Sequence, residues 1–117
     1  MVNKVLVCLF GNDVAPRFDL ATEVVISSMG RDGRVEQKTL VLPQASAEQL
    51  CHMILTEDIR FVICGGIEEE YYQYLTWKRV TVLDSVIGPC DLVLERFRQG
   101  TLKAGNILPD GVGKRDG

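Results

Sequence analysis

Two cysteines, a glycine pair and one arginine are the residues whose types and spacing suggest a binding site. The first cysteine opens the stretch Cys64-Gly65-Gly66, which follows the apolar run 61–63 and precedes a run of helical character. Exposed N–H groups and the positive end of a helix dipole gather at such a junction, favouring anions and lowering the pKa of a thiol. The stretch predicts a site for a negatively charged, thiophilic ligand. The alternative is that Cys64 is a small apolar residue closing a buried strand.

The second cysteine stands in a comparable place. Gly88-Pro89 follows the β-branched run 79–83, and proline is tolerated in the first turn of a helix. A helix is therefore predicted to begin near Pro89, with an apolar stripe formed by Cys90, Val93, Leu94 and Phe97. Cys90, like Cys64, is expected close to a helix N-terminus just after a strand.

The arginine lies in the irregular loop 11–19, where Pro16 forces an extended or turn geometry. The guanidinium of Arg17 is suited to clamping an anion. The alternative is a solvated loop arginine that pairs with Asp13 or Asp19. Sequence alone leaves both interpretations open.

The elements that must position these residues alternate in type along the chain. Continuous apolar runs predict strands buried on both faces, and two β-branched or alternating runs joined by a glycine-bearing turn predict an antiparallel hairpin. Ser46 and Gln49 have the form of a capping box at the start of a helix. Strands are predicted over 4–10, 23–28, 34–42, 60–64 and 79–83, and helices over 46–55, 67–77 and from 89 onward.

This order predicts a single α/β domain over 1–105, followed by a flexible tail over 106–117. The sheet is expected to be mixed, with about five strands: three antiparallel, then βαβ units, with helices on both faces. Ligands of such sheets bind outside the carboxyl ends of the strands. The predicted rim brings together 11–19, 64–66 and 84–90.

Composition narrows the function classes. The chain has 117 residues, 46% of them hydrophobic, a formal net charge of −3 and no basic run, which argues against binding to nucleic acid or an anionic membrane. No apolar run is long enough to span a bilayer and the first residues lead into a strand, so we expect a cytoplasmic protein with reduced cysteines. There is no C-x-x-C pair, and the single histidine, His52, is expected on a helix surface near Glu48.

Three short motifs carry a family resemblance that covers nearly the whole chain, to about Gly105. The segments 14–22, 64–67 and 86–88 resemble those of the dinitrogenase iron-molybdenum cofactor biosynthesis family, the proteins and domains that carry nitrogenase cofactor or its precursor. The resemblance implies a ribonuclease-H-like fold and non-catalytic binding of an anionic metal-sulfur cluster. One branch resembles a small orange-coloured protein that holds a molybdenum-copper sulfide cluster without dedicated metal-ligating side chains. Several members carry a histidine where this chain has Arg17, which favours charge pairing with cluster sulfides.

The resulting hypothesis is a carrier that holds an iron- and/or molybdenum-sulfur cluster and exchanges it with a partner protein. Cys64 and Cys90 are the predicted metal ligands, and the further predicted contacts are Arg17, Gly65, Gly66 and Gly88. One alternative is a regulatory or protein-interaction domain of the same fold with no bound cluster. The other is a nuclease or phosphotransferase, which needs carboxylates converging on two cations, whereas Asp13, Asp19, Asp84 and Asp91 lie in predicted loops or turns.

Overall fold

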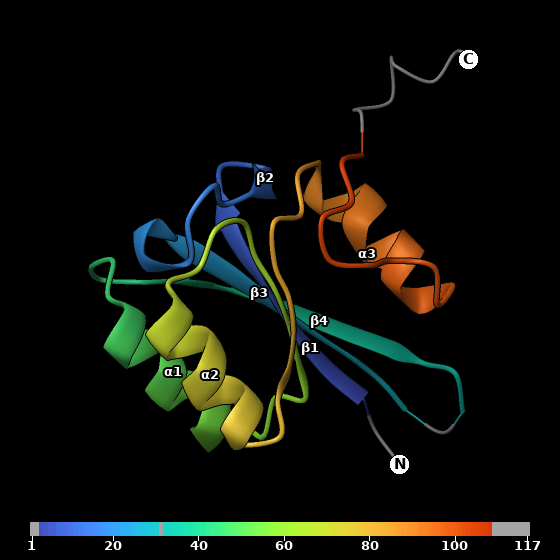
Figure 1. The fold of residues 1–117 in the computed structure, drawn as a ribbon. Coiled ribbons are helices and arrows are strands. Elements are labelled where there is room, and N and C mark those ends of the chain that lie inside the picture. The colour runs from blue at the N-terminus through green and yellow to red at the C-terminus, as the bar shows by residue number, and fades with distance from the viewer. Residues whose placement is uncertain (1–2, 31, 109–117) are drawn as a thin grey trace.

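The computed structural model describes residues 3–30 and 32–108. The strands are β1 (Asn3–Phe10), β2 (Asp13–Val14), β3 (Glu23–Met29), β4 (Val35–Val41), β5 (Phe61–Ile63) and β6 (Thr81–Leu83). The helices are α1 (Ala47–Thr56), α2 (Glu69–Trp77) and α3 (Cys90–Arg98), with a short 3-10 helix over Phe18–Leu20 (Figure 1).

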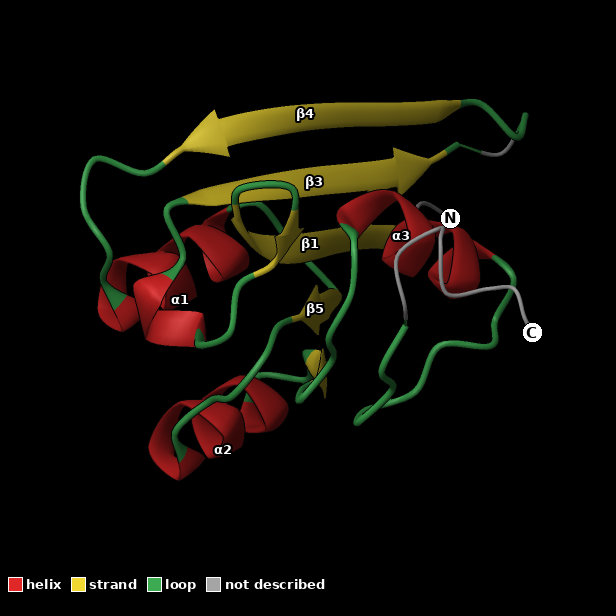
Figure 2. Ribbon diagram, turned by 90° about the horizontal axis from the view of Figure 1, so that it is seen from above, coloured by secondary structure: helices red, strands yellow, loops and turns green. Residues whose placement is uncertain are grey.

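The strands form one mixed sheet in the order β4-β3-β1-β5-β6. β3 pairs antiparallel with β4 on one side and with β1 on the other (Figure 2). β1 pairs parallel with β5, and β5 pairs parallel with β6. The two apolar runs pair in the middle, with Val5 opposite Phe61 and Val7 opposite Ile63. The predicted α/β class and mixed sheet are confirmed, and one further short strand, β2, pairs with the end of β1.

The helices cover both faces of the sheet, α1 and α2 on one side and α3 on the other (Figures 1 and 2). Side chains of a strand alternate between faces, so β1 supplies Leu6 and Cys8 to the core under α1 and α2, and Val5, Val7 and Leu9 to the core under α3. Every strand residue near the centre is therefore buried, which explains the continuous apolar runs in the sequence.

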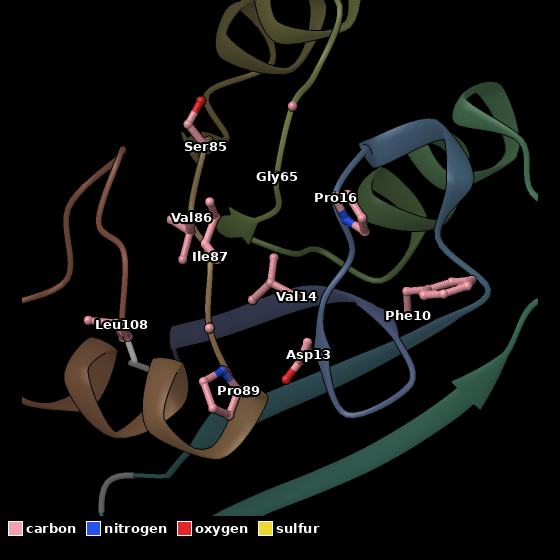
Figure 3. Close-up of a pocket in the computed structure, with 12 residues that line it drawn as sticks. Phe10, Asp13, Val14, Pro16, Gly65, Ser85, Val86, Ile87, Pro89 and Leu108 are labelled. Atoms are coloured by element: carbon pink, nitrogen blue, oxygen red, sulfur yellow. The ribbon is translucent and has the colours of Figure 1, made fainter. Parts of the chain in front are cut away.

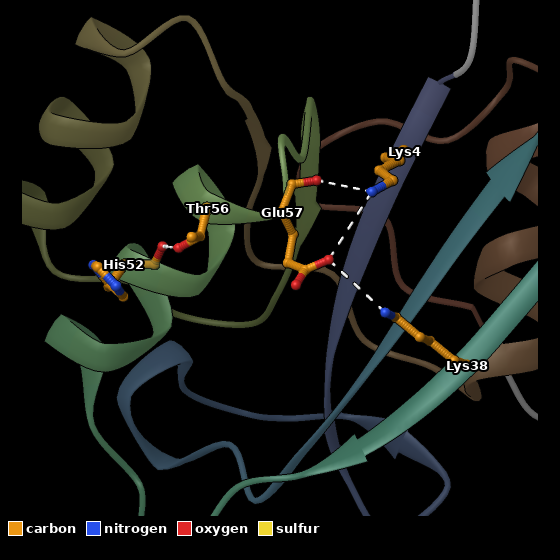
Figure 4. Close-up of polar contacts among 5 residues, drawn as sticks. All are labelled: Lys4, Lys38, His52, Thr56 and Glu57. Atoms are coloured by element: carbon orange, nitrogen blue, oxygen red, sulfur yellow. Dashed lines mark hydrogen bonds and ion pairs between the residues drawn. The ribbon is translucent and has the colours of Figure 1, made fainter.

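The predicted cap of α1 is present, since Ser46 Oγ accepts a hydrogen bond from the Gln49 amide at 3.2 Å. Just after the helix, Glu57 ties it to the sheet (Figure 4). Lys4 Nζ donates to the Glu57 carbonyl oxygen at 2.9 Å, and the Glu57 carboxylate lies 3.8 Å from Lys38 Nζ. In the last turn of α1, the Thr56 hydroxyl donates to the His52 carbonyl oxygen. α1 is thereby fixed against β1 and β4.

Several predicted boundaries and stripes differ from the structure. α2 begins at Glu69, two residues later than predicted from its apolar stripe of Ile67, Tyr71, Tyr74 and Leu75, of which Tyr74 is 39% exposed. The sequence pattern of 100–105 also suggests a short extended piece, but these residues form no strand, although Leu102 packs into the core under α3. A short helix of two to three turns buries only part of its apolar face. The sequence pattern of such a helix therefore does not show which of its apolar residues contact the sheet.

The chain stays attached to the domain beyond residue 105. Ile107 forms a parallel bridge with Ile87, and Leu108 is buried in the core under α3. The rest of the predicted tail, 109–117, lies outside the described residues. The three described α-helices are nine or ten residues long, and no described helix has the length and apolarity that a membrane crossing requires.

Candidate ligand-binding site

An open pocket of about 630 Å³ lies beyond the carboxyl ends of β1, β5 and β6 (Figure 3). This is the rim at which α/β sheets of this kind bind ligands, and its volume falls in the usual range for a small-ligand pocket. All three segments expected at the rim contribute to its wall, as does Leu108. The lining residues are Phe10, Asp13, Val14, Pro16, Gly65, Gly66, Ser85, Val86, Ile87, Gly88, Pro89 and Leu108.

Backbone hydrogen bonds join the loop after β2 to the glycine pair after β5. The Gly65 amide donates to the Ala15 carbonyl oxygen at 3.0 Å, and the Gly66 amide donates to that of Pro16 at 2.7 Å. In return, the Phe18 amide donates to the Gly66 carbonyl oxygen at 2.8 Å. The parallel pairing of the sheet therefore continues past the ends of the strands and forms one side of the pocket.

A second set of backbone hydrogen bonds forms the other side. The Val14 amide donates to the Gly88 carbonyl oxygen at 3.0 Å, and the Cys90 amide donates to the Asn12 carbonyl oxygen at 2.9 Å. The Leu108 amide donates to the Ile87 carbonyl oxygen at 2.7 Å. The β1–β2 turn and the segment before α3 are thus held together around the pocket.

These bonds change the expected role of the glycines. The amides of Gly65 and Gly66 already donate within the protein, so neither is free for an anion. Among the described residues, the amide of Gly88, a buried residue of the pocket wall, donates to no acceptor, which distinguishes it from the amides of Gly65 and Gly66. The sequence predicts that the Cys64-Gly65-Gly66 backbone contacts the anion. In the structure, the amides of Gly65 and Gly66 instead bind the loop after β2.

Gly65 is required by the close approach of that loop. A Cβ at this position would lie 2.3 Å from the Pro16 carbonyl oxygen and 2.5 Å from that of Ala15, distances at which atoms overlap. The equivalent Cβ at Gly66 would lie 3.6 Å from Pro16, an ordinary contact. Gly88 has φ +151°, and a Cβ there would lie 2.8 Å from the Leu108 carbonyl oxygen. Gly65 and Gly88 are therefore needed to shape the pocket.

The two candidate thiols do not line the pocket. Cys64 is fully buried in the core under α1 and α2, whereas Cys90, 8% exposed, is buried in the core under α3, on the other face of the sheet. Cys64 follows Ile63, which points to the α3 side, so alternation directs its side chain to the opposite face. The structure does not bring the two sulfur atoms together.

Burial sets the protonation state of both thiols. It raises the pKa of Cys64 to about 12, with the nearby Asp84 carboxylate adding to the increase. It likewise raises the pKa of Cys90 to about 11, with Asp91 adding to the increase. The expected lowering of these pKa values is wrong, because loss of hydration outweighs the helix N-terminus. Ligation of a metal by Cys64 and Cys90 stays a prediction that this arrangement does not support.

Arg17 is engaged by a neighbour in the loop. Its Nη2 lies 2.7 Å from Asp19 Oδ2, and its Nε donates to Asp19 Oδ1 at 3.0 Å, so the carboxylate takes both prongs of the guanidinium. Arg17 is exposed and does not line the pocket. Of the two interpretations left open by the sequence, the solvated pair with Asp19 is the one the structure shows.

The pocket wall is mostly apolar and carries one ionisable group, Asp13. The hydroxyl of Ser85 is its other polar side chain, and Phe10 and Ile87 stand at the mouth, 59% and 57% exposed. No group of three or more histidine, cysteine, aspartate or glutamate residues able to hold a metal is found over 3–30 and 32–108. Sequence reasoning missed Leu108 because it lies in the predicted tail. The signal that could have found it is the short apolar stretch that it forms with the preceding residue, Ile107.

Comparisons with known proteins identify the fold. No family model and no curated protein matches this sequence. Among solved structures, the protein PH0822 superposes with a TM-score of 0.76 at 18% identity, covering 86% of this chain and 93% of its own.

Two further solved structures carry descriptive names. A candidate dinitrogenase from Methanocaldococcus jannaschii, MJ0327, has a TM-score of 0.68 at 24% identity, covering 88% of this chain and 95% of its own. A candidate NifB protein from Thermotoga, TM1290, assigned to the DUF35 family, has a TM-score of 0.66 at 17% identity, covering 93% of this chain and 99% of its own. The chain therefore has the fold of these proteins along nearly their full length.

The glycine pair provides a direct test of how the pocket is built. Gly65→Ala should destabilise the protein by about 1–3 kcal/mol, because its Cβ would displace the backbone of the 14–18 loop. Gly66→Ala, one residue along, should change stability by less than about 0.5 kcal/mol. Urea unfolding of both variants measures the difference. Equal stability of the two variants would show that the loop does not lie against Gly65.

The raised thiol pKa values predict a loss of stability in alkali. The ordinary thiol pKa is 9.0, so the stabilising effect of keeping Cys64 and Cys90 protonated is complete below about pH 9 and is lost as the pH rises through their folded values. Urea unfolding at about pH 8 and about pH 10 should show the wild type losing more free energy of unfolding than a Cys64→Ala, Cys90→Ala variant. An identical loss in both would show that these thiols ionise normally.

Proposed function

We propose that this chain is a non-catalytic carrier that binds an anionic iron- and/or molybdenum-sulfur cluster, or its precursor, in the rim pocket. In this role it would hold the cluster for cofactor assembly or delivery and exchange it with a donor or acceptor protein. The observation that carries the proposal is the position of the pocket. It lies beyond the carboxyl ends of three parallel strands, and its wall contains residues of all three motif segments.

The fold supports this proposal independently of the motifs. A candidate dinitrogenase and a candidate NifB protein have the same architecture over most of both chains. Their names refer to dinitrogenase and to NifB, and the motif segments of this chain likewise resemble a family named for dinitrogenase.

The residues of the pocket fit a cargo held without coordination. Apolar side chains such as Phe10 and Val86 and the backbone of Gly66 offer a wall against which a polarisable sulfide surface can pack. The free amide of Gly88 can donate to a sulfide. We leave Cys64 and Cys90 out of the binding set, since either sulfur would have to leave the core to reach the cargo. A molybdenum-copper sulfide cluster held without metal-ligating side chains would suit such a wall.

Weak binding of the cluster by the pocket is consistent with a carrier role. A cargo that must pass to another protein needs a short residence time, and weaker contacts give faster dissociation. Packing contacts and one amide hydrogen bond leave exchange fast. Asp13, the charged group of the pocket, repels an anion and limits its affinity further.

A second candidate is a protein-interaction domain of this fold that holds no cluster. It is favoured by the apolar side chains at the mouth, where Phe10 and Ile87 are 59% and 57% exposed, and by Ile107, which bridges to Ile87 and is 70% exposed. Exposed apolar residues that gather at one place often mark a protein contact. A carrier also needs such a contact for delivery, so the metal content of the protein distinguishes the two candidates.

Metal content and a charge substitution test the carrier proposal. Protein purified without oxygen should be coloured and contain molybdenum or iron by elemental analysis, and the metal-free protein should bind tetrathiomolybdate. Asp13→Asn should strengthen binding of this dianion by about three- to tenfold, because it removes the negative charge of the pocket. Glu36→Gln on β4 makes the same change of charge away from the pocket and should leave the affinity unchanged.

Protein that is free of metal after anaerobic purification and also fails to bind tetrathiomolybdate would contradict the carrier role and favour the interaction domain. Weaker binding in Asp13→Asn would show that the pocket prefers a cation.

A further inference from the structure

A second pocket, of about 380 Å³, lies under α3 and shares no residue with the rim pocket. It contains residues of β1, β3 and β5 and of the segment that follows α3. Its wall is formed by Val5, Ser27, Ser28, Met29, Phe61, Leu83, Phe97, Arg98, Gly100 and Leu102. Ser28 contributes backbone, because alternation along β3 directs its side chain to the other face of the sheet. An apolar hollow with one cation and one hydroxyl, that of Ser27, has the composition of a small-ligand site.

The cation is the guanidinium of Arg98, which two neighbours hold in place. Its Nη2 donates to Gln37 Oε1 at 3.1 Å and lies 3.4 Å from Ser27 Oγ. Ser27 and Gln37 are directly opposite each other on β3 and β4, so the guanidinium bridges a cross-strand pair. Both contacts use one nitrogen and both partners are neutral, so the positive charge of Arg98, an exposed residue, is balanced by solvent and not by a carboxylate of the described residues.

The rest of the guanidinium is available. Within the described part of the chain, Nε and Nη1 of Arg98 donate to no acceptor, and no carboxylate lies within 4.0 Å. Arg17 is the contrasting case, since Asp19 occupies both of its prongs. Each edge on which a guanidinium can bind a carboxylate through two hydrogen bonds includes Nη2, which is in use here, so a carboxylate would reach one free donor of Arg98, Nε or Nη1.

Ser27 is the second observation that points to a ligand. It is 3% exposed, and it is the buried polar side chain of the described residues. It lies on the same face of β3 as Val25, where the core under α3 is otherwise apolar. A buried hydroxyl normally has a close hydrogen-bond partner, but its contact with Arg98 is long, at 3.4 Å. The hydroxyl is therefore placed to donate to a group that enters the pocket.

The remaining residues of the wall determine which chemical group the rest of the ligand should have. The rings of Phe61 and Phe97 meet edge to face with centroids 5.1 Å apart, and Leu102 and Met29 complete an apolar surface beside them. A polar or highly charged molecule would leave this surface without matching contacts. An aryl or alkyl chain would fill it.

We propose that this pocket binds a small carboxylic acid with an apolar body, its carboxylate on Arg98 and Ser27 and its chain against Phe61 and Phe97. The carboxylate would accept one hydrogen bond from a free N–H of Arg98, on Nη1 or Nε, and one from the Ser27 hydroxyl. The site is separate from the rim pocket, so the proposal does not depend on cluster binding.

Titration of the metal-free protein with 4-phenylbutyrate, followed by amide resonances in NMR, tests the site. We expect a dissociation constant on the order of 1 mM for a ligand of this size, with shifts centred on residues 27–29 and 97–102. The uncharged 4-phenylbutanol should bind about tenfold more weakly or not detectably, because it lacks the carboxylate. This comparison needs no variant, so it holds even if a substitution affects folding.

Substitutions on α3 complete the test. Arg98→Gln should weaken 4-phenylbutyrate binding about tenfold, whereas Arg96→Gln, on the same helix but outside the pocket, should have no effect. Ser27→Ala should weaken it by a smaller factor. The proposal is overturned if the shifts lie elsewhere or are absent, if acid and alcohol bind equally, or if the two arginine variants behave alike.

Discussion

The backbone pairing between the 14–18 loop and the glycines after β5 is the contact on which the geometry of this protein depends. Three hydrogen bonds of 2.7–3.0 Å extend the parallel sheet by one step beyond its strands. They are possible because position 65 has no Cβ, which would otherwise overlap two carbonyl oxygens. This contact fixes the loop and places Pro16 in the pocket wall.

The same pairing determines which groups remain for a ligand. Since the amides of Gly65 and Gly66 are used in the protein, the pocket offers mainly apolar side chains and the amide of Gly88. Regular alternation along β5 and its extension buries Cys64 on the face opposite Ile63. Cys64, which lies five residues before the start of α2, is consequently neutral and packed rather than reactive. The pocket is better suited to holding a polarisable cargo by contact than to coordinating a metal.

The sequence predicted the sheet and the position of the rim, because these follow from strand order and from the apolar runs of β1 and β5. It also predicted the helix start at Ser46, since a capping box is local. It did not predict the outcome for Arg17, because the choice between an anion and Asp19 depends on side-chain geometry in an irregular loop. The two cysteines occupy similar positions relative to a strand and a helix, yet the faces they meet depend on register. The role of Leu108 requires a contact with Ile87, which is distant in sequence.

Charge is distributed unevenly between the two pockets. The rim pocket has Asp13 and no basic residue in its wall, so an anionic cargo there must be held by packing and by the backbone. The pocket under α3 has Arg98 without an anionic neighbour among the described residues. The first arrangement suits reversible carriage of a large soft group, and the second suits recognition of a single carboxylate.

The most direct test of the central claim is to map amide chemical shifts while tetrathiomolybdate is added to the metal-free protein. The account predicts that the largest changes fall on residues 13–16, 65–66 and 85–88, the backbone of the rim pocket, with Gly88 among the strongest. Changes centred on another surface, or none at all, would contradict the assignment of this pocket as the cargo site.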